Sequence, residues 1–280
     1  MGVSFNFGNY KLKILKDTFF YIDAGTLFGL VPKKIWQKEV KVDKNNCVKV
    51  VSKSLLIQTK QLNIIIDTGI GVKLNNKLEK FWNISRKRKL LTLLKKENIS
   101  PEKIDIVILS HLHFDHSGWN TIYVNNELKP TFPNAKYIIQ KKEWKVATNP
   151  DEIYGKRAYL PENILPIKNA DKLILINGNV EIVKGITCIL TGGHTPGHQI
   201  VKINTGSKTI LFLGDLVPTH HHIKLTWNQS FDLMPLENAY QKKYYFEKAI
   251  DNKWLLIFSH DIKFDMCYLN KDGIITNYNG

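Results

Sequence analysis

The sequence predicts an α/β domain with several layers, in which strands and helices alternate along the chain. Short apolar runs of strand character recur throughout and are separated by turn residues and by helical segments. The chain has 280 residues, of which 43% are hydrophobic, and this is enough to bury a sizeable core without disulfides. We therefore expect a single domain that covers residues 1–280.

In the first part of the chain, apolar runs predict strands at residues 10–15, 54–59, 62–66 and 104–109. The run at 104–109 is apolar throughout, which indicates a strand buried on both faces. Residues 86–97 predict an amphipathic helix with leucines on one face. Ser100 and Pro101 then indicate a second helix start, because proline is favoured at the first helical position.

In the second part, strands are predicted at residues 136–139, 173–176, 186–190, 200–203, 209–213 and 254–258. Helices are predicted at residues 141–147 and 236–252. The proline-containing span 150–166 is either an insertion over the core or an ordinary surface loop.

Ligand-type side chains follow several of these strands. The motif HLHFDH directly follows the buried strand, and GGHTPGH, GD and SHD follow three later strands. Because residues after strand ends gather at one rim of a sheet, we expect their side chains to converge. Imidazole and carboxylate in this number suit two divalent ions, zinc first, with iron or manganese as alternatives. The candidate ligands are His111, His113, Asp115, His116, His194, Asp215 and His260.

The spacing of these residues divides them between two ions. His111 and His113 are two positions apart, so in an extended segment they point to the same side and can share one ion with His194. The next two residues of the motif, at 115 and 116, can turn toward a second ion with the histidine at 260. Asp215 has two carboxylate oxygens and can bridge both ions.

These motifs, together with IDTG at residues 66–69, resemble the metallo-β-lactamase superfamily, and the resemblance covers nearly the whole chain. It implies a four-layer αββα sandwich with a dinuclear site at one edge of two packed sheets. It also carries the seven candidate residues over as metal ligands. Asp115 beside His116 is the hydrolase form of the motif, which makes a redox role less favoured.

Within that superfamily, residues 27–36, 132–144 and 214–222 resemble a branch of bacterial metallohydrolases that includes the quorum-quenching N-acyl homoserine lactonases. Known lactonases often place a tyrosine three residues after the bridging aspartate, where this chain has Pro218. The run His220, His221 and His222 either takes the place of that phenol or forms an exposed polar turn.

The resemblance predicts a metal-dependent hydrolase that opens a lactone or cleaves a related ester. Two cations lower the pKa of a bridging water and so supply hydroxide near neutral pH. Asp115 is expected to orient that hydroxide and pass its proton to the leaving oxygen, or else to act only as a ligand.

Other residues near the motifs have two interpretations each. Asp67 of IDTG either fixes the tautomer of a ligand imidazole or shapes a turn. His198 is expected to shape the loop that carries His194 rather than to bind metal, and Thr195 and Gly197 to serve the same turn. Two groups of aromatic residues form either an acyl-chain pocket or core, and they are Phe19, Phe20, Tyr21, Phe28 and Trp36, and Tyr154, Tyr159, Trp227 and Phe231.

The formal net charge of +15 favours an anionic partner or an acidic substrate. It supports a second candidate function, a phosphodiesterase or nuclease of the same superfamily, and a third, a non-catalytic metal-binding or nucleic-acid-binding protein. However, the clusters Arg86–Lys89 and Lys95–Lys96 lie within a predicted helix, and the other cations are scattered. We therefore favour a solvated lysine-rich surface over a nucleic-acid-binding face.

Cellular context follows from cysteines and hydropathy. Cys47, Cys188 and Cys267 are odd in number and far apart, which indicates free thiols in a reducing compartment. No apolar run is long enough to span a bilayer, and the first residues lack a signal-type segment. We expect a cytoplasmic protein that does not bind membranes, and the sequence is compatible with a homodimer.

Overall fold

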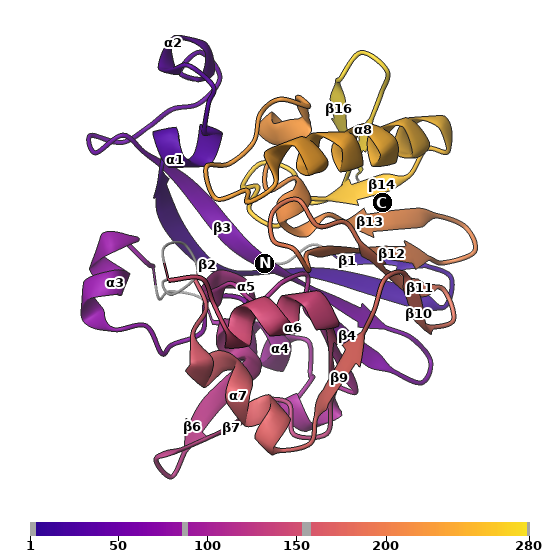
Figure 1. Cartoon of the computed structure of the whole chain (residues 1–280). Coiled ribbons are helices and arrows are strands. Elements are labelled where there is room, and N and C mark those ends of the chain that lie inside the picture. The colour runs from indigo at the N-terminus through magenta and orange to yellow at the C-terminus, as the bar shows by residue number, and fades with distance from the viewer. Residues whose placement is uncertain (1–3, 86–88, 153–157, 279–280) are drawn as a thin grey trace.

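A computed structural model describes residues 4–85, 89–152 and 158–278. Two seven-stranded sheets pack face to face, with helices on the outer faces (Figure 1). The first sheet has the order β1-β2-β3-β4-β5-β8-β9, and the second has the order β10 to β16. The predicted α/β class and four-layer αββα sandwich are confirmed.

The strands of the first sheet are β1 (Ser4–Phe7), β2 (Tyr10–Asp23), β3 (Cys47–Gln58), β4 (Asn63–Ile66), β5 (Ile106–Ile108), β8 (Lys136–Gln140) and β9 (Leu173–Ile176). Those of the second sheet are β10 (Val180–Val183), β11 (Ile186–Leu190), β12 (Gln199–Asn204), β13 (Thr209–Phe212), β14 (Leu255–Ile257), β15 (Cys267–Leu269) and β16 (Ile275–Asn277). A separate hairpin consists of β6 (Thr121–Val124) and β7 (Glu127–Pro130).

The α-helices are α1 (Ala24–Phe28), α2 (Lys33–Trp36), α3 (Asn76–Phe81), α4 (Leu90–Lys96), α5 (Phe114–Ser117), α6 (Lys141–Thr148), α7 (Pro161–Asn169) and α8 (Pro235–Asp251). Short 3₁₀ helices are η1 (Pro101–Lys103), η2 (Gly118–Asn120), η3 (Gly214–Leu216) and η4 (His220–Ile223). Both α7 and α8 begin with proline, whose fixed φ suits the first helical position. Among the described residues, no helix combines the length and apolarity needed to cross a membrane.

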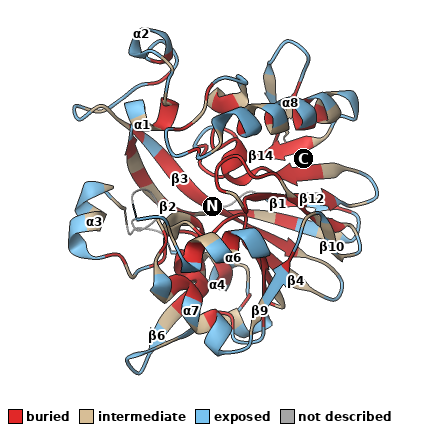
Figure 2. Cartoon of the chain, in the orientation of Figure 1, coloured by how far each residue is buried: buried red, intermediate tan, exposed pale blue. Residues whose placement is uncertain are grey.

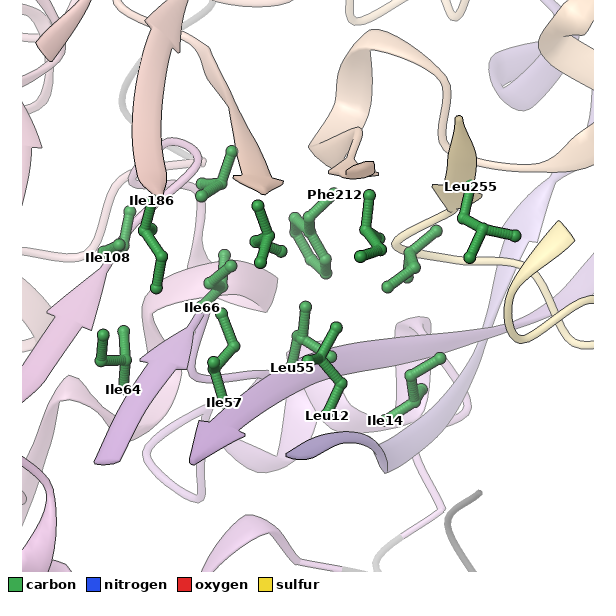
Figure 3. Packing of buried hydrophobic residues seen from close by; sticks show 14 of the residues in the cluster. Leu12, Ile14, Leu55, Ile57, Ile64, Ile66, Ile108, Ile186, Phe212 and Leu255 are labelled. Carbon is green, nitrogen blue, oxygen red and sulfur yellow. The ribbon is translucent and has the colours of Figure 1, made fainter. Parts of the chain in front are cut away.

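The central core lies between the two sheets. Leu12, Leu55 and Ile66 of the first sheet face Phe212 and Leu255 of the second (Figure 3). Apolar residues of α4, α6 and α7 cover the outer face of the first sheet. Helix α8 covers the outer face of the second sheet, so exposed residues concentrate on the helices and loops (Figure 2).

Several predicted boundaries were wrong. The strands predicted at 10–15 and 54–59 are the halves of a much longer hairpin, formed by β2 and β3, that lie farthest from its connecting segment. A register shift between Lys16 and Thr18 interrupts the alternation of side chains there, which hides the continuation from a period-2 search. The strand predicted at 104–109 is reduced to β5, and the helix predicted after Ser100 is only the single turn η1.

Two further predictions lie partly outside the described residues. The helix predicted at 86–97 is present from Leu90, while residues 86–88 are not described. In the span 150–166, residues 153–157 are not described, and Pro161 begins α7, which contains Pro166. This end of the span is therefore a helix on the core rather than a surface loop.

Candidate metal centre

One edge of the sandwich collects the ends of strands from both sheets. Strands β11, β13 and β14 run in the same direction, since β11 and β13 are both antiparallel to β12 and β13 is parallel to β14. Their carboxyl ends lead to His194, Asp215 and His260. The HLHFDH motif follows β5, and a hydrogen bond from Gln199 N to the carbonyl of Ser110 joins the two sets of loops (2.8 Å).

The structure brings the seven predicted ligands together. The ligand atoms of His111, His113 and His194 all lie within 4.8 Å of one another. The same holds for Asp115, His116 and His260, and for a third group that joins His111 and His116 to Asp215. Five of the seven residues are buried, His113 is partly buried, and Asp115 has the most exposed side chain of its group, at 13%.

Asp215 lies between the two groups. Its Oδ1 is 3.2 Å from His116 Nε2 and 3.1 Å from His260 Nε2, whereas its Oδ2 is 3.6 Å from His194 Nε2. Ser259 donates to Oδ1 (2.8 Å) and the Gln229 amide donates to Oδ2 (3.3 Å). The carboxylate therefore turns one oxygen toward each group of histidines, which is the arrangement that a bridging ligand requires.

The donor atoms fit divalent cations. His116 Nε2 faces His260 Nε2 at 3.0 Å, and His194 Nε2 faces His113 Nδ1 at 3.1 Å. Ligands held about 2.1 Å from a tetrahedral ion lie roughly 3.4 Å from one another, close to these separations. The buried Nε2 of His111 has no hydrogen-bond partner, which is costly unless that nitrogen binds something else.

The electrostatics agree with this fit. Burial, together with the neighbouring histidines, lowers the pKa of His111 and of His113 well below the usual value, so both imidazoles stay neutral as metal ligands must. Burial also acts to lower the pKa of His116, but the carboxylates of Asp215 and Asp115 outweigh it and raise that pKa well above the usual value. Burial likewise acts to lower the pKa of His194, but its hydrogen bond to Asp232 and the charge of Asp215 outweigh burial and raise that pKa. The carboxylates thus favour positive charge in both groups.

Buried carboxylates orient the imidazoles from behind. Asp67 Oδ2 accepts a hydrogen bond from His116 Nδ1 (2.8 Å), which confirms the expected contact of Asp67 with a ligand imidazole. Asp67 also accepts from the backbone N–H and the hydroxyl of Ser110, each at 2.7 Å. His198 belongs to none of the three groups. Its carbonyl accepts from Thr191 N (2.9 Å) and Gly192 N (3.0 Å), which shapes the loop that carries His194, and its Nε2 accepts from the Asp215 N–H (3.0 Å).

Sequence reasoning missed two buried acids. Asp232 accepts from His194 Nδ1 (2.8 Å). Glu143 accepts from Leu112 N (2.9 Å) and from the Thr195 hydroxyl (2.6 Å), so it ties both ligand-bearing loops to α6. Asp232 does not follow a strand. Glu143 comes three residues after β8, but it lies among lysines that look like a solvated helix face. The one signal in the sequence was that Asp232 stands among apolar residues in FDLMP, which indicates burial.

The aromatic residues divide between core and site. Phe28, Trp36 and Trp227 pack together in one buried cluster, which is the core interpretation. Phe20 is also buried, and its ring meets that of His260 edge-on at 5.6 Å. Tyr159 lies beside the site, with its ring 5.0 Å from that of His113 and its hydroxyl donating to Glu143 (3.2 Å).

Three further aromatic residues fall outside that core: Phe19 and Tyr21 lie on the long strand β2, and Phe231 is 39% exposed. Tyr154 is not among the described residues.

The prediction of an exposed polar turn at residues 220–222 was wrong. His222 is fully buried, stacks on Phe28 and bonds the carbonyl of Leu27 (2.9 Å). His220 Nδ1 bonds Asp261 Oδ2 at 2.5 Å. At the position of the lactonase tyrosine, the carbonyl of Pro218 accepts from His260 N (2.8 Å), so this segment supports a candidate ligand through its backbone.

Comparison with known proteins agrees with this geometry. Residues 49–258 match the Metallo-beta-lactamase superfamily. An N-acyl homoserine lactonase from Bacillus cereus is 32% identical over 168 residues, which are 56% of this chain and 60% of that protein. The chain thus spans less than two thirds of the length of this curated relative.

Two solved structures extend the similarity over the whole chain. A probable metal-dependent hydrolase from Staphylococcus aureus has a TM-score of 0.91 at 28% identity, with 99% of each chain covered. AidC, described as a dizinc quorum-quenching lactonase, has a TM-score of 0.82 at 21% identity and covers 100% of this chain and 98% of its own, which shows the shared fold.

The relatives are metal-dependent hydrolases, and N-acyl homoserine lactonases are prominent among them, as the lactonase-like motifs predicted. The match extends across both sheets and includes every candidate ligand up to Asp215, while His260 lies just beyond it. From its sequence, its fold and the geometry of its clustered histidines, this chain belongs to the metallo-β-lactamase superfamily.

Proposed function

We propose that the protein is a dinuclear metal-dependent hydrolase that opens a lactone of the N-acyl homoserine type or cleaves a related ester. The observation that carries this proposal is the position of Asp215 between two groups of imidazole and carboxylate ligands. The lactonase relatives support the lactone as the substrate class.

The proposed ligand sets follow the observed groups. His111, His113 and His194 would hold one ion, and Asp115, His116 and His260 the other, with Asp215 shared. Zinc is the proposed metal, because buried imidazole with carboxylate is a donor set that zinc favours, and iron or manganese are the alternatives. Divalent cations in such a site supply an activated water at neutral pH and polarise a carbonyl oxygen.

Asp115 is the proposed catalytic residue. Its Oδ2 lies 3.5 Å from His260 Nε2 and 3.7 Å from His116 Nε2, and the Ser52 hydroxyl holds its main-chain carbonyl (2.8 Å). Because its side chain retains some exposure, one carboxylate oxygen can accept a proton beside the reacting carbonyl and deliver it to the leaving oxygen.

We also propose that residues 1–280 form one domain, since the candidate ligands come from both sheets. The three cysteines are free, and two of them are buried, which fits the cytoplasmic location proposed here. The small-molecule substrate is the proposed partner, and a homodimer is the assembly to compare with a monomer.

The test combines metal analysis with a substrate panel. The chain should contain close to two zinc ions, and His113→Ala should lose metal and activity, whereas His221→Ala, which changes a histidine outside the ligand groups, should keep both. The panel contains acyl homoserine lactones, simple esters, thioesters and bis(p-nitrophenyl) phosphate. Cleavage of the phosphodiester alone would favour the nuclease alternative that the +15 charge suggests, and RNA binding without any hydrolysis would favour a non-catalytic protein.

A further inference from the structure

A chain of buried polar side chains connects the candidate ligand His194 to helix α8. His194 Nδ1 donates to Asp232 Oδ1 (2.8 Å), because a carboxylate only accepts. The other oxygen, Asp232 Oδ2, accepts from the Asn238 amide (2.9 Å) and from Gln229 N (3.0 Å). The Asp232 carboxylate is therefore held in place by two hydrogen bonds at Oδ2, while its Oδ1 contacts the His194 imidazole.

Lys242 lies at the far end of this chain. It is fully buried, and its Nζ donates to the carbonyl of Trp227 (2.7 Å) and to Asn228 Oδ1 (2.8 Å). Asn228 Oδ1 also accepts from the Asn238 amide (3.4 Å). The ammonium of Lys242 is thus connected to the carboxylate of Asp232 through Asn228 and then Asn238, and every link is a hydrogen bond between buried or half-buried groups.

A buried ammonium is costly unless nearby groups compensate for its charge. Burial lowers the pKa of Lys242 to about 8, and the negative charge of Asp232 opposes that shift. The lysine is therefore still a cation at neutral pH. A hydrophobic residue of similar length would fill the same space without this charge, so packing alone does not account for a lysine here.

Backbone contacts make the connection to the ligand loop rigid. Gly193 has a φ of +81°, and a Cβ at this position would lie 2.7 Å from Asn238 Oδ1. Met234 N donates to the carbonyl of Gly193 (2.8 Å), and Leu233 N donates to that of His194 (3.1 Å). The first turn of α8 is thus pressed against the residue before the ligand.

We propose that Lys242 is a positioning residue for the metal centre, which holds Asp232 through Asn228 and Asn238 so that His194 presents Nε2 to the first group of ligands. A carboxylate behind a metal-binding histidine fixes its tautomer and raises its basicity, and Lys242 provides the opposite charge for that carboxylate. This inference rests on the proposed metal centre.

The test measures zinc affinity with Zn²⁺ as the probe. Lys242→Met removes the charge and keeps most of the volume, and Lys243→Met changes the exposed neighbour on the same helix. Competition with a chromophoric chelator should show that Lys242→Met binds one of two zinc ions about tenfold more weakly, at the lower end of effects for groups behind a ligand. Lys243→Met should match the unmodified chain, and the visible absorption of the cobalt-substituted protein should change only in Lys242→Met.

A double-mutant cycle separates this role from a purely structural one. In an Asp232→Asn background, Lys242→Met should cause no further loss of zinc affinity, because the carboxylate through which it acts is already gone. An equal loss in both backgrounds, or a lower melting temperature of the metal-free chain with unchanged zinc affinity, would overturn the inference. If Lys242→Met yields too little folded protein, Asn228→Ser breaks the same connection and should weaken the same ion.

The outcome also distinguishes this inference from the proposed function. Absence of zinc binding by the unmodified chain would overturn both. Two tightly bound ions in the unmodified chain, with the same affinities in Lys242→Met, would overturn the role of Lys242 alone.

Discussion

Asp67, a single residue of the IDTG motif, accepts hydrogen bonds from several donors at once. It is fully buried, has a φ of +56° and accepts from the backbone and hydroxyl of Ser110 as well as from His116. The left-handed backbone is uncommon for a residue other than glycine. One acid thus shapes the turn and orients the imidazole, so the two sequence interpretations of Asp67 are both present.

Asp67→Asn should weaken metal binding in the second ligand group. An amide has a single oxygen, so it cannot accept at both positions. Either the Ser110 N–H at Oδ1 loses its acceptor, or His116 Nδ1 and the Ser110 hydroxyl at Oδ2 do. Loss of a hydrogen-bonded group behind a ligand typically costs about 10- to 100-fold in metal affinity. Zinc content after dialysis against a chelator gradient measures the change, and retention of both ions at the original affinity would contradict it.

Asp17 should make the protein less stable as pH rises through the weakly acidic range. Burial raises the pKa of Asp17 from 3.8 to about 6, despite hydrogen bonds from Thr18 and Ile70. The folded chain then binds the proton more tightly than the unfolded chain, so stability is greatest below pH 3.8 and is lost as pH rises through about 6. The shift corresponds to about 3 kcal/mol at neutral pH.

Asp17→Asn carries no charge at either pH and should therefore gain stability relative to the parent by up to about 3 kcal/mol between pH 4 and 7. Urea unfolding at both pH values measures the difference. Thr18→Val, which removes the neighbouring hydroxyl but leaves the carboxyl, is the control and should keep the pH dependence. A stability difference that does not vary with pH would show that Asp17 does not titrate in this range.

Whether a functional residue could be predicted from the sequence depended on whether it lies in a short motif after a strand. The seven candidate ligands occur in short motifs after strands, so local sequence was enough to select them. Asp232 and Glu143 are positioned by the folded chain alone, since they meet His194 and Thr195 across 38 and 52 positions. Isolated acids in a loop and on a lysine-rich helix carry no pattern that predicts such contacts.

Among elements, α6 and the GGHTPGH loop approach each other unusually closely. A Cβ at Gly197 would overlap the backbone nitrogen and Cα of Glu143, and Glu143 accepts from the hydroxyl of Thr195 in the same loop. The absence of a side chain at Gly197 therefore allows the first turn of α6 to reach both ligand loops.

Gly197→Ala should displace α6 from the loop and destabilise the fold by about 1–3 kcal/mol, as overpacking of a filled site does. It should also weaken zinc binding, because Glu143 would no longer reach both loops. Gly25→Ala is a matched control, since its Cβ would meet only the side chain of Asp23, at 3.0 Å. Urea unfolding and chelator competition measure both effects, and equal results for the two variants would argue against a special packing role for Gly197.

Element boundaries were the weakest part of the sequence prediction, and β2 shows why. Its 14 residues contain a register shift between Lys16 and Thr18, and adjacent residues on both sides of that shift are buried, which breaks the period of two along the strand. The strands β11, β12 and β13 were predicted closely because they are short, apolar and bounded by turns. Regular strands could be predicted from the local sequence, whereas the full length of the distorted strand β2 becomes apparent only from its pairing with β3.

At the scale of the whole molecule, both sheets contribute residues to the candidate metal centre. His111, His113, Asp115 and His116 follow the first sheet, while the other three ligands follow strands of the second. The layer order itself could not be derived from periodicity, because strands buried on both faces look alike in either sheet. It was predicted through the resemblance of the motifs, and the pairing of β9 with the first sheet and β10 with the second was not foreseen.

Removal of metal should therefore destabilise the entire fold, not only a loop. Ions that bind only the folded chain contribute about 2.7 kcal/mol each at a free concentration 100 times the dissociation constant. Chelation should lower the melting temperature measured by calorimetry, and added zinc should restore it. His221→Ala, outside the ligand groups, should show the same metal-dependent shift, and an unchanged melting temperature after complete metal removal would contradict the proposal.

The described chain builds one sheet completely before it begins the other, with the change between β9 and β10. A ribosome that is producing this protein consequently releases the HLHFDH segment long before His260 is synthesised. During that interval the histidines of the HLHFDH segment would meet cellular metal before His194 and His260 have been synthesised. For the proposed metal centre, both ions could be held only after the second half of the chain is translated. A paused or truncated nascent chain would offer a partial set of the candidate ligands, from which metal would exchange.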